Sequence, residues 1–203
     1  LEVHLLAGDV KVRVDELATV PTATSKGAAL ELERIEHGYR LRGHTGDEQA
    51  LVERLLNNVQ KSDISITLPP GYGLHLEMKA GDIEIRGPVA ALTGRLMAGD
   101  LGAKEVCGID FSFSAGDIDL GLRLEEGEHR LRAVAGDIDL RMLPGSDVSL
   151  RGHLNIGDLS LPAGWPATKR GLGSSFEHAL GSGRASFTVD LATGDLAIEA
   201  DGA

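Results

Sequence analysis

The sequence predicts an all-β fold, a β-solenoid in which coils of about 17–21 residues stack on one another. Three observations support this prediction: a Gly-Asp phrase recurs along the chain, apolar residues alternate on both sides of it, and its copies are nearly evenly spaced. The clearest copy is LRAVAGDIDLRM at residues 131–142. We interpret seven pairs as structural corners: Gly8-Asp9, Gly81-Asp82, Gly99-Asp100, Gly116-Asp117, Gly136-Asp137, Gly157-Asp158 and Gly194-Asp195.

Alternating apolar residues predict a β-strand on each side of every Gly-Asp pair. In the fourth copy these residues are Phe111, Phe113 and Ala115 before the pair, then Ile118 and Leu120 after it. A period of two is typical of a strand with one buried face. The step from Ala115 to Ile118 is three residues and would reverse the buried face of a flat strand, so the chain must bend there. Glycine permits the bend and aspartate can hydrogen-bond a nearby amide, so each copy is expected to form strand, corner and strand.

The spacing of the copies predicts the order of the stack. From Gly81 to Gly157 the pairs start 18, 17, 20 and 21 residues apart, and 37 residues then separate Gly157 from Gly194. We therefore expect four regular coils over 81–161, then a longer excursion, and a final repeat at 187–198 that closes the fold. One domain is expected, with N-terminal strands and a capping helix at 1–62, regular coils at 63–161, and the excursion with the closing repeat at 162–203.

Two segments near the ends depart from the repeat and are expected to cap the stack. Residues 28–43 predict a β-hairpin, and the capping box Thr45-Gly46-Asp47-Glu48 predicts a helix over 47–59. The apolar stripe of this helix would cover an open end or bind a partner. Residues 162–185 lose the alternation and predict a surface loop, with a short helical turn at 176–180 and with Trp165, Leu172, Phe176 and Leu180 as capping side chains. With both ends covered, a monomer or small oligomer is expected.

Composition narrows the classes of partner. The net charge of −11 argues against nucleic acid and anionic membranes as direct partners. The chain has no run of 18 apolar residues, so no membrane span is expected. Cys107 is the single cysteine and is expected to be a small buried residue, which leaves the compartment open. The chain starts at Leu1 without a methionine, which fits a fragment or a processed product and leaves an anchor or a further domain open.

Stacking would also bring the corner aspartates together, about 5 Å apart. Like charges at that distance repel by about 0.8 kcal/mol in water, so something must offset the repulsion. Either each carboxylate caps the backbone amides of its own corner, or the column binds calcium, which prefers clustered oxygen ligands. We favour capping, because the chain contains no known calcium-binding repeat, and we expect Asp119 and Asp139 to point into solvent. The column expected from the regular coils consists of Asp82, Asp100, Asp117, Asp137 and Asp158.

No motif for catalysis or for cofactor binding is present. The seven histidines are spread singly, and the Gly-rich stretches at 171–175 and 181–184 lack the phosphate-loop pattern. We therefore predict no enzyme activity, no catalytic residue, no cofactor and no metal, with the Asp column as the alternative metal site. A lyase-like enzyme would instead combine acidic metal ligands with an arginine base, for which the candidates are Arg95, Arg123, Arg130, Arg132, Arg141 and Arg151.

A longer motif carries a family resemblance. The chain reads I-x-I-x-L-P-x-G at 64–71, L-x-L-x-x-x-A-G-D-I-x-I at 74–85 and GYRLR at 38–42. It thereby resembles a bacterial putative-adhesin family of β-strand-repeat domains, a domain of unknown function related to the heads of autotransporter adhesins. The resemblance implies a right-handed β-helix, often at the bacterial envelope. We favour a location at the cell envelope or outside the cytoplasm, with the cytoplasm left open, and expect an unidentified protein or envelope component as partner. The function expected is a non-enzymatic binding or scaffolding module, and the alternatives are a polymerising scaffold similar to bactofilins and the lyase-like enzyme.

Overall fold

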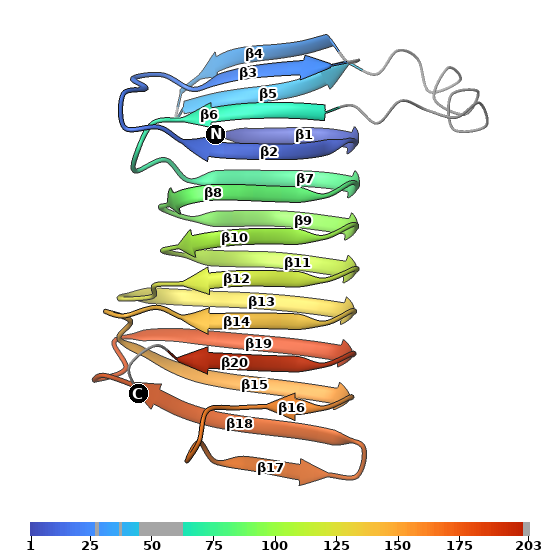
Figure 1. The fold of residues 1–203 in the computed structure, drawn as a ribbon, viewed down its shortest axis with the longest axis vertical. Helices are drawn as coiled ribbons and strands as arrows, with labels where there is room; N and C mark the ends of the chain where they lie inside the picture. The colour runs from blue at the N-terminus through green and yellow to red at the C-terminus, as the bar shows by residue number, and fades with distance from the viewer. Residues whose placement is uncertain (27–28, 37, 45–62, 201–203) are drawn as a thin grey trace, which may run out of the picture.

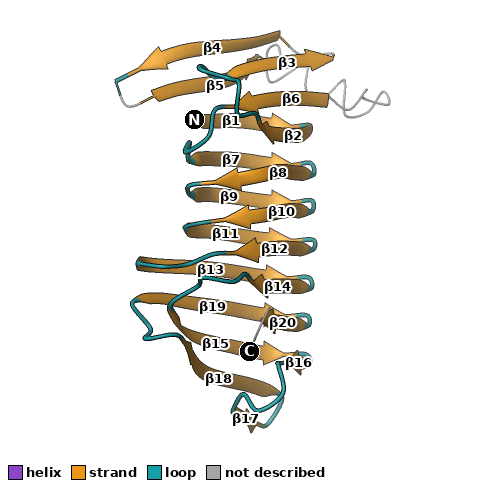
Figure 2. Ribbon diagram, turned by 60° about the vertical axis from the view of Figure 1, so that its left-hand side comes forward, coloured by secondary structure: helices purple, strands orange, loops and turns teal. Residues whose placement is uncertain are grey.

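The computed structural model describes residues 1–26, 29–36, 38–44 and 63–200, and every regular element within them is a β-strand. The strands form two sheets that face each other across one apolar core, so the molecule is an elongated stack (Figure 1). Short corners lie along one side of the stack (Figure 2). The all-β prediction is confirmed, whereas the expected helix at 47–59 lies outside the described residues.

Each sheet continues from one end of the stack to the other. The eleven-stranded sheet contains, in spatial order, β17 (Ala167–Arg170), β18 (Gly173–Leu180), β15 (Val148–Ile156), β19 (Ala185–Thr193), β13 (Gly127–Ala135), β11 (Ile109–Ala115), β9 (Leu92–Ala98), β7 (Leu74–Ala80), β1 (Glu2–Ala7), β5 (Gly38–His44) and β4 (Ala29–Ile35). The nine-stranded sheet contains β16 (Leu159–Ser160), β20 (Leu196–Ala200), β14 (Ile138–Met142), β12 (Ile118–Leu122), β10 (Leu101–Val106), β8 (Ile83–Val89), β2 (Asp9–Val14), β6 (Asp63–Leu68) and β3 (Thr22–Lys26).

Two strands joined by a Gly-Asp corner make one repeat unit, with one strand in each sheet. Strands of neighbouring units pair in parallel, and each residue pairs with the residue at the equivalent position of the next unit. Leu74 thus pairs with Leu92, and Leu92 pairs with Ile109. Alternate side chains point between the sheets, where Leu76 and Phe111 are fully buried. No polar or charged residue is buried in the described part of the chain. Apolar burial therefore stabilises the core, at about 1.5–3 kcal/mol for each large side chain.

The order of the units in space differs from their order in the sequence. Unit β19–β20 lies between β13–β14 and β15–β16, and unit β1–β2 lies between β7–β8 and strands β5 and β6. Leu131 of β13 accordingly pairs with Val189 of β19, which pairs in turn with Gly152 of β15. The expectation that the repeat at 187–198 closes the fold is wrong, because this repeat fills an interior position. All units carry apolar residues at equivalent positions, so spacing alone does not determine which units are neighbours.

The corners begin earlier than the alternation indicated. Phe113 is the last buried residue before the fourth corner and Ile118 is the first after it, while Ala115, expected in the core, is exposed. The chain crosses from one sheet to the other between these buried residues, so the alanine lies on the outside of the turn. It is in register there with Ala98 and Ala135 of the neighbouring units, and its small side chain suits the tight turn.

Antiparallel strands form both edges of the eleven-stranded sheet and one edge of the nine-stranded sheet, which ends at its other edge on the parallel strand β16. At one end β4 pairs with β5, which confirms the predicted hairpin, and β3 pairs with β6. At the other end β18 pairs with β15, and β17 pairs with β18. The prediction of one surface loop over 162–185 is therefore wrong for 167–170 and 173–180, which form β17 and β18, and residues 176–180 belong to β18 instead of a helical turn.

The capping side chains of this segment fall into two groups. Phe176 is buried over Gly152, where an added Cβ would lie 1.9 Å from the Phe176 ring, and Trp165 and Leu180 pack against the core. Leu172 is 72% exposed, contrary to expectation. Phe176 is the only fully buried side chain of β18, which is why no alternation was readable in this strand.

One carboxylate anchors the turn from β18 to β19. Asp147 accepts hydrogen bonds from the Arg184 side chain at 2.6 Å, the Ser182 hydroxyl at 2.8 Å and the Gly183 amide at 2.6 Å. The hydrogen bond from Arg184, followed by that from Ser182, holds the pKa of Asp147 well below its usual range. The ionised form of Asp147 is therefore favoured by folding.

Acid is expected to remove this contribution. Because the pKa of Asp147 is lower in the folded than in the unfolded chain, its stabilisation is complete above about pH 5 and is lost as the pH falls through and below the unfolded pKa. We expect the unfolding free energy of the Asp147→Asn variant to change less between pH 4.5 and pH 2.5 than that of the unmodified chain. Urea titrations at stepped pH measure this difference, and parallel pH profiles would contradict it.

Candidate binding surface

The Gly-Asp corners form one column, in which glycine has a steric role. Gly136 has a φ of +127°, and a Cβ added to it would lie 1.6 Å from the carbonyl oxygen of Gly116. The glycines of the other stacked corners approach the neighbouring corner in the same way. A Cβ added to Gly99, for example, would lie 2.1 Å from the carbonyl oxygen of Gly81. A side chain is thus excluded by the neighbouring unit as well as by the backbone conformation.

The aspartates of the column are joined by a ladder of hydrogen bonds. The amide of Asp117 donates to Oδ1 of Asp100 at 3.0 Å, and the amide of Asp137 donates to Oδ1 of Asp117 at 3.1 Å. Each carboxylate up to the last in the column thus caps the amide of the next unit, which corrects the expectation that it caps its own corner. The column also runs in the spatial order of the units, so Asp195 stands between Asp137 and Asp158. The complete ladder is Asp9, Asp82, Asp100, Asp117, Asp137, Asp195 and Asp158, and Asp63 pairs in register with Asp9.

The surroundings of the ladder are acidic. Asp119 and Asp139 are exposed neighbours on β12 and β14, as expected. Partial burial, followed by the charges of Asp119 and Asp137, raises the pKa of Asp139. Among the described residues, no three or more His, Cys, Asp or Glu side chains are grouped so that they could hold a metal ion.

Substitution of one rung tests the ladder. Asp137→Ala is expected to destabilise the protein by about 0.5–1.5 kcal/mol, because the Asp195 amide loses its acceptor but remains accessible to water. Asp137→Asn retains an acceptor oxygen and removes one of several like charges, so its unfolding free energy is expected to match or exceed that of the unmodified chain. Urea unfolding compares the two variants. If both variants lost the same unfolding free energy, the negative charge of Asp137, and not its hydrogen bond to the Asp195 amide, would be the stabilising feature.

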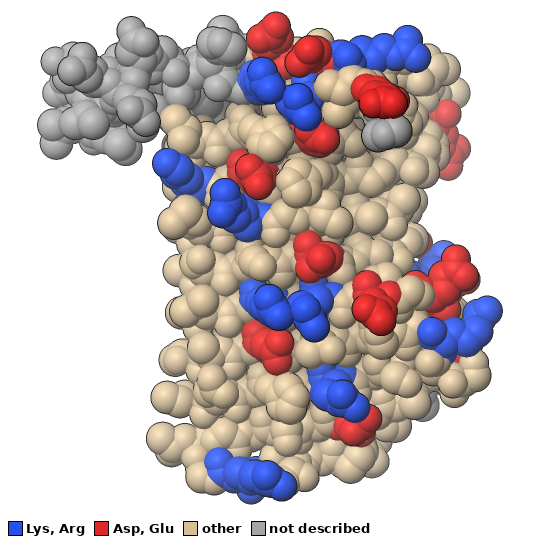
Figure 3. All heavy atoms as spheres, turned by 180° about the vertical axis from the view of Figure 1, so that it is seen from behind, with Lys and Arg blue, Asp and Glu red and all other residues tan. Residues whose placement is uncertain are grey.

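Charged and polar side chains lie along the whole outer face of the eleven-stranded sheet. This sheet lies behind the other in Figure 1, so Figure 3 shows its outer face, where positive and negative side chains are interspersed among uncharged residues along the stack. Parallel register aligns eight residues of consecutive strands, about 4.8 Å apart per strand. We call this set the polar row: Arg42, His4, Glu77, Arg95, Ser112, Arg132, Asp190 and His153.

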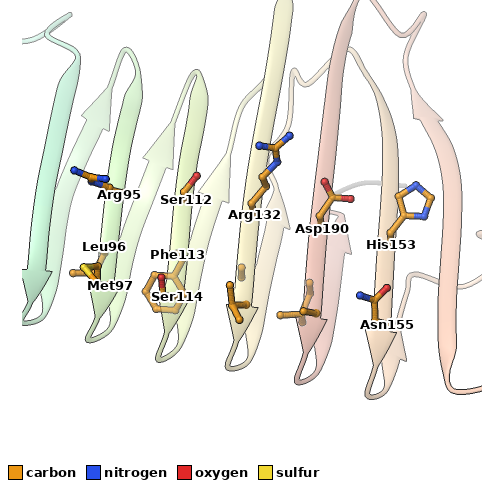
Figure 4. A pocket seen from close by; sticks show the side chains of 14 residues that line it. Arg95, Leu96, Met97, Ser112, Phe113, Ser114, Arg132, His153, Asn155 and Asp190 are labelled. Atoms are coloured by element: carbon orange, nitrogen blue, oxygen red, sulfur yellow. The ribbon is translucent and has the colours of Figure 1, made fainter.

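A hollow of about 600 Å³, which we call the face groove, lies on this face over β9, β11, β13, β19 and β15 (Figure 4). Five members of the polar row line it, from Arg95 to His153. Its apolar part includes Met97 and Val134, which are 52% and 59% exposed. The face groove thus offers hydrogen-bonding groups and exposed apolar surface side by side.

A second hollow, of about 480 Å³, lies further along the same face and is lined by Glu2, His4, Arg40, Arg42 and His75. Arg40 donates to Glu2 at 2.7 Å, and this hydrogen bond lowers the pKa of Glu2. The rings of His4 and His75 are 6.1 Å apart, and Nδ1 of His4 lies 3.2 Å from Glu77. These two histidines are distant in the sequence, and only the register of β1 with β7 brings them together.

The arginines that the sequence proposed for a lyase do not form one group. Arg95, Arg130, Arg132 and Arg151 belong to strands of the eleven-stranded sheet, and Arg141 belongs to β14 in the other sheet. Arg123 follows β12 and pairs with Glu105 at 3.2 Å. In the described part of the chain, no ion pair joins these six arginines to Asp100, Asp117, Asp137, Asp195 or Asp158.

Cys107 differs from its expectation. It is exposed in the turn between β10 and β11, because Val106 occupies the buried position at the end of β10. Partial desolvation, followed by the charge of Glu105, raises the pKa of its thiol. The alternation of apolar residues is interrupted at the end of β10, so it did not show that Val106, and not Cys107, faces the core.

Comparison with known proteins supports the fold. No family model and no curated protein matches the sequence. A solved structure of a putative cell adhesion protein from Clostridium sporogenes is similar over 98% of this chain and 92% of its own, with a TM-score of 0.55 and 11% identity. At this identity the similarity establishes a related β-rich fold. Among the described residues, no helix is long and apolar enough to cross a membrane.

Proposed function

We propose that the chain is a non-enzymatic β-solenoid binding module with an adhesin-like role at the cell envelope, and that the outer face of the eleven-stranded sheet is its binding surface. The observation that carries the proposal is the polar row, which runs in register across eight strands and borders two hollows. The structural neighbour, described as a putative cell adhesion protein, agrees with this role.

The pairing of the units supports the solenoid part of the proposal. Parallel units with register steps of 18, 17 and 20 residues fit solenoid coils, as between Leu74 and Leu92, Leu92 and Ile109, and Asp110 and Arg130.

Two further features support a discrete module over a filament. Antiparallel strands at both edges of the eleven-stranded sheet, and at the β3 edge of the nine-stranded sheet, interrupt the parallel pairing that an end-to-end polymer would continue. The other edge of the nine-stranded sheet is β16, a parallel strand of only two residues. The net charge of −11 also opposes self-association. We propose a monomer or small oligomer.

Adhesion of protein-coated beads to bacterial and animal cells tests the binding surface. Ala192→Trp places a large side chain in the face groove, and Ala197→Trp places the same side chain on the outer face of the other sheet of the same unit. We expect the first variant to lose adhesion and the second to retain it, with similar unfolding midpoints. Retained adhesion by Ala192→Trp would rule out this face, and beads with the unmodified chain that adhere no better than albumin-coated beads would rule out the adhesin role.

A further inference from the structure

We propose that the face groove binds a linear acidic polysaccharide, whose sugars carry carboxylate or sulfate groups, and that Arg95 and Arg132 bind those groups. The proposal rests on the proposed function, because it names the ligand class of the same surface. Four properties of the face groove lead to it: its charge, the free donors of its arginines, their spacing, and the nature of the groups between them.

The charge of the face groove differs from that of the whole protein. Its lining contains two arginines, Arg95 and Arg132, against one carboxylate, Asp190, which gives a formal charge of +1 from 2 − 1 in a chain of −11. The local excess attracts an anionic group, while the negative charge of the whole molecule disfavours a ligand with densely packed charges. An acidic polysaccharide that alternates charged groups with neutral hydroxyls fits both conditions.

Arg132 has its donors available for a ligand. It is exposed, and no hydrogen bond or ion pair joins it to another described residue, although Asp190 is its neighbour in register. Arg95 has one long contact, at 3.9 Å, with Glu77 outside the face groove. A guanidinium group presents several donors in a planar arrangement that matches the oxygens of a carboxylate or sulfate. Both side chains can therefore each bind one acidic group.

The positions of the two arginines favour an extended ligand. Arg95 and Arg132 are on β9 and β13, with Ser112 of β11 between them (Figure 4), so they are two strand spacings or about 10 Å apart along the stack. The polar row continues from Arg95 to Arg42 over three further strand spacings, where the second hollow lies. A compact anion would reach one arginine, whereas a linear chain along the stack axis meets the arginines in succession.

The groups around the arginines favour a carbohydrate over a nucleic acid. Asp190 can accept hydrogen bonds from sugar hydroxyls, Ser112 and Asn155 can donate and accept them, and Met97 offers apolar contact to the carbon face of a sugar ring. Phosphates in a continuous run would instead be repelled by Asp190. Single-stranded nucleic acids also require several aromatic side chains on which successive bases stack, whereas the lining has a single exposed ring, the His153 imidazole, and Phe113 is only 3% exposed.

Binding of defined polysaccharides to the full chain tests the proposal. Immobilised hyaluronan presents carboxylates on alternate sugars, kappa-carrageenan presents sulfates on alternate sugars, and dextran is the uncharged control. We expect one or both acidic polymers to bind, more weakly as salt is raised, and dextran not to bind. Arg95→Ser with Arg132→Ser should weaken binding about tenfold or more, because both charge-assisted contacts are lost.

A matched control removes the same charge from the other sheet. Arg86→Ser with Arg141→Ser alters the outer face of β8 and β14, and is expected to change affinity less than about threefold, since only the long-range charge differs. The proposal would be overturned if both double variants lost the same affinity for the acidic polymers. It would also be overturned if the unmodified chain bound dextran or single-stranded DNA as tightly as it binds the acidic polymers.

The bead assay separates this proposal from the proposed function. If no acidic polymer binds while Ala192→Trp still abolishes bead adhesion, the polysaccharide proposal is wrong and the binding surface stands. If acidic polymers bind through Arg95 and Arg132 while coated beads do not adhere to cells, the adhesin role is wrong and the ligand class stands.

Discussion

Removal of residues 185–200 is expected to abolish cooperative folding of the chain. These residues form β19 and β20, which lie inside the stack between β13–β14 and β15–β16. Five large side chains would lose their burial, at about 1.5–3 kcal/mol each or roughly 8–15 kcal/mol together, which equals the whole stability of a typical domain. These side chains are Phe187, Val189, Leu191, Leu196 and Ile198.

Circular dichroism and urea unfolding of the truncated chain measure this effect. Ser186→Ala with Thr188→Ala, which alters outward positions of β19, should retain the unfolding midpoint of the unmodified chain. If the last repeat were instead at the end of the stack, the truncated chain would keep a cooperative transition with a moderately lower midpoint. That result would contradict the interior position of β19 and β20.

Gly136→Ala is expected to have the largest effect of any single corner substitution. The new Cβ would lie 1.6 Å from the carbonyl oxygen of Gly116, the shortest distance in the column, at a φ of +127°. We expect a loss of about 3–5 kcal/mol, from about 1–2 kcal/mol of backbone strain and about 2–3 kcal/mol of steric displacement of the neighbouring unit.

Gly145→Ala provides a matched control for the backbone component. Gly145 also has a positive φ, of +92°, but an added Cβ would have no other atom within 4 Å. Its substitution should therefore destabilise by only about 1–2 kcal/mol. Urea unfolding of the two variants gives the difference directly. Equal losses would mean that close stacking of the corners contributes nothing to the requirement for glycine.

The sequence predicted the parts of the fold that depend on local chemistry. Alternating apolar residues identified the strands of the repeat units, and Gly-Asp pairs marked the points where the chain turns. The hairpin of β4 and β5 was readable for the same reason. By contrast, the exposed Ala115 and Cys107 lie at strand ends, where alternation no longer tells which side chain faces the core.

The order of the units could not be predicted, because each unit presents equivalent apolar positions to its neighbours. This order also determines which residues lie side by side in the candidate site. Arg132, Asp190 and His153 are adjacent in the polar row only because β19 lies between β13 and β15. In the sequence, Asp190 is far from the other two and carries no motif. Candidate site residues on such a sheet are thus recognisable only after the register is known.

Cross-linking on the outer face tests this arrangement most directly. In a Cys107→Ser background, Glu128→Cys with Ser186→Cys places two thiols on the adjacent strands β13 and β19, and Glu128→Cys with Ser149→Cys places them on β13 and β15. Adjacent strands are about 4.8 Å apart, within reach of a disulfide, whereas two strand spacings of about 10 Å are not. We predict that mild oxidation forms the bond between positions 128 and 186, and not between 128 and 149. The opposite pattern would place β15 beside β13 and would contradict both the stack order and the polar row.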